Sequence, residues 1–248
     1  LQEELTPCAV QGQCQSPLGP TTVGLIYVNP AGPLGSEGDP VASQADIVDA
    51  FSRMGLNDTE SVALIGGGHA FGKCHGACVN PPCGEGDLLG VGPNTYTSGY
   101  EGAWTRRPTT WTNDYVNNLF DINWVVGTGA GGKIQWFEEN KTSADDEIMM
   151  LTTDIALREA SYKPISRLFA DNMGELELQF KHAWYRLTSA DMGTVDRCLG
   201  DDVPPAQEWQ HPLPEPPANL AEIDFVAIRS AIQALVDEDS AKIGAYTN

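Results

Sequence analysis

Apolar residues recur at helical spacing through most of the chain after residue 45. A capping-box pattern from Ser43 to Asp46 precedes apolar residues at 47, 50, 51 and 54, which predicts a helix. The same pattern from Asn57 to Glu60 precedes residues 62–65, which are apolar on all sides and predict a buried helix. Three further helices are expected at about residues 113–120, 164–170 and 174–188.

Short apolar pieces without helical spacing lie between these helices. Trp124, Trp136 and residues 149–151 are predicted to be extended, and residues 79–100 to form a loop rich in glycine and proline. The expected fold is therefore mainly α, with small β pieces and long irregular loops. Such long connections are typical of a protein whose core is filled by a cofactor.

Three regions of different composition divide the chain. Residues 1–45 are rich in Gly, Pro and Ser and read as an irregular arm around the strand-like residues 25–28. Residues 46–211 carry most of the helical pattern and are expected to form the main domain. Residues 212–248 begin with a proline-rich linker and continue into an amphipathic helix, which we expect to dock onto another surface.

The charge of the chain limits its partners. Lys and Arg number 14 against 34 Asp and Glu, for a net charge of −20. Such a chain repels the phosphates of nucleic acids and anionic membranes, so neither is an expected partner. The chain has no apolar run of the length that a membrane span needs, and its first residues do not resemble a signal peptide, so we expect the numbering to begin on a processed chain.

Six cysteines indicate the compartment. Cys8 and Cys14 lie near the start, Cys74, Cys78 and Cys83 cluster, and an even total permits three disulfides of unspecified pairing. A zinc site made by the cluster and His75 is the alternative, although the spacing matches no closed zinc module. Asn57 and Asn140 each begin a glycosylation sequon, so with the cysteines and the charge the sequence favours a secreted protein.

The most informative segment ends the apolar helix predicted around residues 62–65. Gly66, Gly67 and Gly68 directly precede His69. Glycines lack a Cβ, so a flat macrocycle or another backbone can approach them closely, while the imidazole offers a nitrogen to a metal. A core histidine in a glycine-rich turn is the alternative, and this segment alone does not decide between the two.

Further segments carry a resemblance to a known family. Residues 24–30, 51–58, 98–105, 150–154 and 180–187 follow one another in the order found in class I haem peroxidases, and the similarity is greatest to the N-terminal domain of catalase-peroxidases. The resemblance implies the proximal half of a haem peroxidase fold. It also implies haem b as the cofactor.

The resemblance assigns roles to individual residues. His69 is expected to bind the haem iron through Nε2, and Asp154 to accept a hydrogen bond from its Nδ1, which would make the iron electron-rich. Trp104 is expected to stack beside His69 and to donate its indole N–H to Asp154. Lys73 and His75 resemble positions that approach a haem propionate.

Two other residues match a feature of catalase-peroxidases. Tyr27 and Met54 correspond to the tyrosine and methionine that those enzymes cross-link with a distal tryptophan. Ala190 stands where they carry a mobile arginine, which makes catalase activity doubtful. The family's distal arginine, tryptophan and histidine precede the first matching segment, so we expect another chain or a cleaved segment to supply them.

These expectations define the predicted function. The chain is expected to use hydrogen peroxide to oxidise small phenolic or aromatic donors, with a second polypeptide completing the pocket. A haem-binding module without efficient turnover is the alternative. A disulfide-stapled structural module without cofactor is a third possibility, although the presence of His69, Trp104 and Asp154 argues against it.

Overall fold

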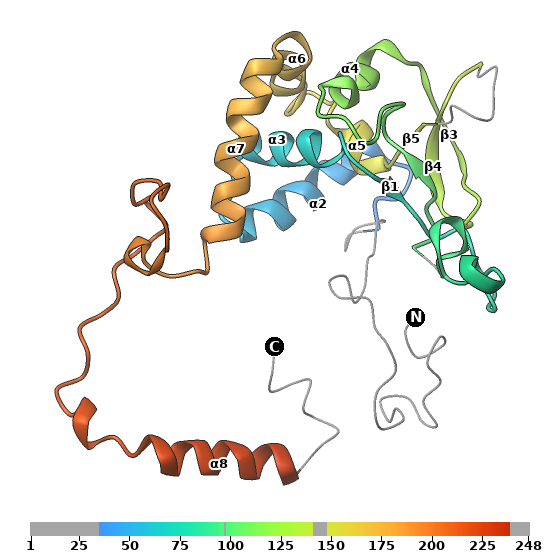
Figure 1. The fold of residues 1–248 in the computed structure, drawn as a ribbon. Coiled ribbons are helices and arrows are strands. Elements are labelled where there is room, and N and C mark those ends of the chain that lie inside the picture. Colours follow the sequence, from blue (N-terminus) through green and yellow to red (C-terminus); the bar gives the residue numbers. More distant parts are fainter. Residues whose placement is uncertain (1–34, 97, 141–147, 239–248) are drawn as a thin grey trace. The chain divides into compact units, whose positions relative to one another are not determined.

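The computed structural model describes residues 35–96, 98–140 and 148–238, which divide into two compact units between Met192 and Gly193. Figure 1 shows the helices and small sheets of the first unit. The elements of the first unit are α2 (Pro40–Arg53), α3 (Asp58–Gly68), β1 (Lys73–Cys74), η1 (Gly86–Leu88), η2 (Gly92–Asn94), β2 (Gly102–Ala103), α4 (Asp114–Asp121), β3 (Trp124–Thr128), β4 (Ile134–Glu138), β5 (Met149–Met150), α5 (Thr152–Ala156), α6 (Lys163–Asp171) and α7 (Met173–Ser189). The mainly α fold class is confirmed. The predicted division at residues 45 and 211 stays a prediction.

The start of α2 differs from the prediction. The helix begins at Pro40, and the Asp39 side chain accepts hydrogen bonds from the backbone N–H groups of Val41 and Ala42. Ser43 and Asp46 are buried inside the helix, where Asp46 accepts a hydrogen bond from the Ser36 hydroxyl. The capping-box assignment at Ser43 was therefore wrong, because an Asp followed by Pro starts the helix one turn earlier.

The capping box of α3 is present as predicted. Asn57 Oδ1 accepts from the Glu60 backbone N–H at 2.9 Å, and Glu60 Oε2 accepts from the Asn57 backbone N–H at 2.9 Å. The apolar helix that follows is buried, with Val62 and Ala63 fully inaccessible. Figure 1 shows α3 lying beside α2 and α7, and its middle residues pack in the core while its two ends, Asp58 and Gly68, are exposed.

The three glycines before His69 have different surroundings. A Cβ on Gly67 would lie 2.2 Å from Phe180 Cδ2 of α7. A Cβ on Gly66 would lie 3.4 Å from Val116 Cγ1, in ordinary contact with the core. A Cβ on Gly68 would meet nothing within 4 Å. Gly67 therefore lets α7 approach α3, while Gly68 faces open space.

Two small sheets bring distant segments together. β1 and β2 pair antiparallel, with Lys73 opposite Ala103, which places the chain after His69 beside the chain before Trp104. β3, β4 and β5 form an antiparallel sheet whose last strand leads directly into α5. The extended pieces predicted around Trp124, Trp136 and residues 149–151 are thereby confirmed.

The cysteines of the described residues do not form a zinc site. Cys78 and Cys83 are joined in a disulfide, with their Cα atoms 5.7 Å apart. Cys74 is a half-buried free thiol and Cys198 an exposed one, and within the ranges described no three His, Cys, Asp or Glu residues gather as metal ligands. Cys8, Cys14 and Tyr27 lie outside the described residues.

The second unit is described from Gly193 to Glu238. It contains η3 (Val195–Arg197), η4 (Leu220–Glu222) and α8 (Phe225–Glu238), the last as predicted from its amphipathic pattern. The Asp224 carboxylate accepts from the backbone N–H groups of Val226 and Ala227 and starts α8. The apolar side chains of α8 are exposed, and their docking stays a prediction. Of all the helices described, none is long and apolar enough to cross a membrane.

The glycine packing gives a prediction for stability. Gly67→Ala is expected to lower the free energy of unfolding by about 1–3 kcal/mol, because the new methyl group must displace the Phe180 ring. Gly68→Ala is the matched control and is expected to leave stability unchanged or raise it by up to about 1 kcal/mol, since alanine favours the helix and has room. Urea unfolding measures both, and equal effects would contradict the packing role of Gly67.

Candidate active site

Three side chains from separate elements meet at the end of α3. His69 is the residue that follows α3, Trp104 follows β2, and Asp154 lies in the first turn of α5. The pairing of β1 with β2 sets the first two side by side, and the step from β5 into α5 turns the third toward them. The structure thus brings together three residues that the sequence separates by as many as 85 positions.

The His69 ring is held between aromatic side chains. It stacks on Trp104 with ring centroids 3.9 Å apart and planes 8° from parallel. Tyr115 of α4 meets the ring edge-on, at a centroid distance of 5.2 Å and an angle of 82°. These two contacts fix both the position and the plane of the imidazole.

Asp154 collects hydrogen-bond donors on both carboxylate oxygens. Its Oδ2 accepts from Trp104 Nε1 at 2.8 Å and from the Leu151 backbone N–H at 2.7 Å, and its Oδ1 accepts from the Tyr115 hydroxyl at 2.7 Å. The side chain is completely buried. Burial alone would raise the pKa of Asp154, but the His69 charge and the converging hydrogen bonds hold that pKa below its usual value. The carboxylate is therefore ionised.

The contact between Asp154 and His69 orients the imidazole. His69 Nδ1 lies 2.9 Å from Asp154 Oδ1, a close electrostatic contact whose geometry departs from a linear hydrogen bond. Nδ1 is itself buried, whereas the whole His69 side chain keeps 24% of its accessible surface. The exposed part of the ring is therefore the opposite edge, which carries Nε2.

Tyr115 was not identified from the sequence. Burial, followed by the charge and hydrogen bond of Asp154, raises the pKa of Tyr115 well above its usual value. The phenol therefore keeps its proton and donates a hydrogen bond to the carboxylate. In the sequence Tyr115 is one apolar position of a predicted helix. No local signal reveals that its hydroxyl reaches a residue 39 positions away.

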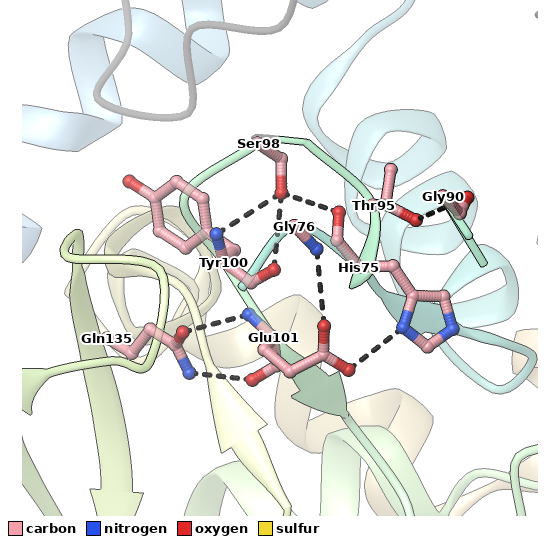
Figure 2. A network of polar contacts seen from close by, with 8 residues as sticks. All are labelled: His75, Gly76, Gly90, Thr95, Ser98, Tyr100, Glu101 and Gln135. Atoms are coloured by element: carbon pink, nitrogen blue, oxygen red, sulfur yellow. Dashed lines mark hydrogen bonds and ion pairs between the residues drawn. The ribbon is translucent and has the colours of Figure 1, made fainter. Parts of the chain in front are cut away.

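A second polar network fixes His75 (Figure 2). His75 Nδ1 lies 2.8 Å from Glu101 Oε1, and the Gly76 backbone N–H donates to Glu101 Oε2 at 3.2 Å. Gln135 holds Glu101 in place by accepting from its N–H at 3.0 Å and donating to its C=O at 2.9 Å. Because an ionised carboxylate only accepts hydrogen bonds, we assign the proton of this contact to His75 Nδ1. The other ring nitrogen, Nε2, has no partner among the described residues. Sequence analysis did not single out Glu101 or Gln135.

The other predicted site residues lie at the surface. Lys73 is exposed on β1 and makes no ion pair with any residue that the structure describes. Met54 follows α2 and is 42% exposed, and Tyr27 lies outside the described residues. The roles of Lys73 and His75 beside a propionate, and the cross-link of Tyr27 with Met54, stay predictions.

The chain is similar in sequence to known proteins. A family described as Peroxidase matches residues 17–172. The chain belongs to the peroxidase family. Catalase-peroxidases of Yersinia pestis (strain Pestoides F) and Yersinia pseudotuberculosis (serotype O:3, strain YPIII) are each 43% identical over 245 residues, which cover 88% of this chain and 33% of the relative. The chain thus spans about a third of the length of these relatives. The predicted membership among class I peroxidases is confirmed.

Membership of the peroxidase family implies a haem cofactor, and the residues present fit one. An imidazole edge with Nε2 faces outward, while its Nδ1 is buried against a carboxylate. Gly68 beside it faces open space, as the approach of a flat ring requires. Gly66 and Gly67, which were also predicted to bind the cofactor, instead face core side chains and Phe180.

The buried carboxylate gives a prediction for stability. Asp154→Asn is expected to lower the free energy of unfolding by about 3 kcal/mol, because one carboxylate oxygen is replaced by an amide N–H₂ that faces donors. Asp114→Asn removes a carboxylate paired with Arg107 near the surface and is expected to cost about 1 kcal/mol or less. Denaturant unfolding measures the loss of stability in both variants. Equal losses would show that the buried carboxylate of Asp154 stabilises the fold no more than one near the surface.

The thiol next to His75 gives a second prediction. Burial, with smaller effects from Asp154 and Glu101, raises the pKa of Cys74 to about 12, so the thiol stays protonated and unreactive at pH 8. Iodoacetamide is expected to modify exposed Cys198 in the folded protein and Cys74 only after unfolding. Peptide mass spectrometry reads both sites, and modification of Cys74 at the rate of Cys198 would contradict its burial.

Proposed function

We propose that this chain forms the proximal half of a haem b peroxidase, with His69 as the axial ligand of the iron. The observation that carries the proposal is the arrangement of His69, whose Nδ1 contacts a buried carboxylate while its Nε2 edge is exposed. Metal-ligating histidines usually have their second nitrogen held in this way by a carboxylate or carbonyl. When bound, haem b would supply the redox chemistry with peroxide.

The residues around His69 would then act on its electronic character. Asp154, whose carboxylate is held by the donors of Trp104, Tyr115 and Leu151, would draw the Nδ1 proton toward itself and so make Nε2 a stronger electron donor. Trp104 and Tyr115 hold the carboxylate in place through their hydrogen bonds and restrict the ring by stacking and edge contact. Lys73 and His75 are the candidates for contact with a haem propionate.

The reaction proposed is the oxidation of small phenolic or aromatic donors by hydrogen peroxide. Peroxide is reduced to two water molecules, and two donor molecules each lose one electron and one proton. Catalase activity is not proposed, because Ala190 stands at the position where the resemblance expects an arginine. The disulfide between Cys78 and Cys83 and the two sequons support secretion.

A distal acid–base group is proposed to come from polypeptide outside this chain. Such a group typically accelerates peroxide chemistry by about 10²–10⁴-fold, and the resemblance places it before the first matching segment. We propose a second polypeptide, either a separate chain or a cleaved segment, that carries an arginine, a tryptophan and a histidine.

Exogenous imidazole tests the axial ligand. His69→Gly in the protein purified with its associated chains is expected to lose the Soret spectrum of a histidine-ligated haem, and added imidazole is expected to restore it. His182→Ala is the control, because His182 is an exposed histidine of α7 and should leave the spectrum unchanged.

Two outcomes would alter the proposal. A wild-type sample without a Soret band, with every associated chain retained, would remove haem from the function altogether. A normal Soret band with no reaction toward peroxide would instead identify a haem-binding module without turnover.

A further inference from the structure

A pocket of about 420 Å³ opens between α4, β4, α5 and α6 on the first unit. This volume lies within the range of small-molecule sites in proteins. Its charged and aromatic lining residues are Phe120, Trp136, Arg158, Glu159, Lys163 and Arg167. None of them belongs to the cluster of His69, Trp104, Asp154 and Tyr115.

The charge of this pocket is opposite to that of the protein. Arg158, Lys163 and Arg167 give it three positive charges against the single carboxylate of Glu159, whereas the chain as a whole carries −20. None of the three cations forms an ion pair with a residue that the structure describes. By contrast, ion pairs hold other basic residues of this unit, namely Arg53, Arg106, Arg107, Lys181 and Arg186. Three uncompensated cations in one concave site of an acidic protein favour an anionic ligand.

The remaining walls favour an aromatic body on that ligand. Trp136 donates its indole N–H to Thr152 at 3.3 Å, which fixes the half-buried ring at the edge of the pocket. The Arg167 guanidinium lies 3.7 Å from the centre of the Phe120 ring. This cation–π contact restrains a long side chain whose N–H groups have no partner among the described residues, so less entropy is lost when it binds an anion.

We propose that this basic pocket, defined by Arg158, Lys163 and Arg167 with Trp136 and Phe120, binds a small aromatic carboxylate. The guanidinium groups match a carboxylate through paired N–H donors, and the rings offer flat apolar surface to an aromatic ring. Glu159 offsets part of this positive charge, and the aromatic walls favour an anion that carries a ring over inorganic phosphate. The inference goes beyond the proposed peroxidase reaction and does not depend on haem binding.

Calorimetric titration of the intact protein at low ionic strength, with benzoate as the probe, tests the site. Benzoate is expected to bind at least about 10-fold more tightly than benzamide, which has the same shape without the charge. Arg158→Gln and Arg167→Gln are each expected to weaken benzoate binding by about 10-fold. Arg53→Gln removes an equal charge from the exposed surface of α2 and is expected to leave the affinity for benzoate unchanged.

Glu159→Gln guards against loss of folding as an explanation. This variant is expected to tighten benzoate binding several-fold, since it removes the one carboxylate of the pocket. Damage to the fold cannot produce tighter binding. The proposal is overturned if benzamide binds as well as benzoate, if the Arg158 and Arg167 variants bind like the Arg53 variant, or if inorganic phosphate matches benzoate.

Discussion

A carboxylate removed from water must be surrounded by donors, and the site depends on how Asp154 meets that requirement. An indole N–H, a phenol, a backbone N–H and an imidazole nitrogen all lie within hydrogen-bonding distance of its two oxygens. These groups come from four separate segments of the chain, so the buried charge also ties those segments together. Leaving either oxygen of the buried carboxylate without a donor would cost free energy, so these segments are held in one relative arrangement.

The second constraint is the close approach of α7 to α3. Gly67 makes room for the Phe180 ring, and the helix that carries His69 is thereby held against the longest helix of the first unit. Gly68, one position later, has no protein neighbour within 4 Å of the Cβ position. A run of three identical residues thus serves two purposes: the first two face the protein interior, and the third leaves space beside the imidazole.

Charge is distributed unevenly over this acidic chain. At the site, one fully buried carboxylate sets the orientation of His69, and Glu101 does the same for His75 near the surface. Elsewhere in the first unit, three cations without acidic partners among the described residues line a pocket with two aromatic rings. The two places differ in where the compensating group comes from: Asp154 and Glu101 find their partners inside the protein, whereas cations without a counter-charge among the described residues attract one from a ligand.

The sequence by itself determined the helices with strong apolar periodicity, the capping box of α3 and membership of the peroxidase family. These features depend on local spacing and on motifs that remain adjacent in the chain. It placed the start of α2 wrongly, because Asp39 competes with Ser43 for the same helix. It identified His69, Trp104 and Asp154 through resemblance but missed Tyr115, Glu101 and Gln135, whose polar atoms act on residues 26 to 39 positions away. Only the tertiary structure decided which glycine packs, which edge of His69 is exposed and which cations remain unpaired, because contacts between distant segments leave no periodic trace in the sequence.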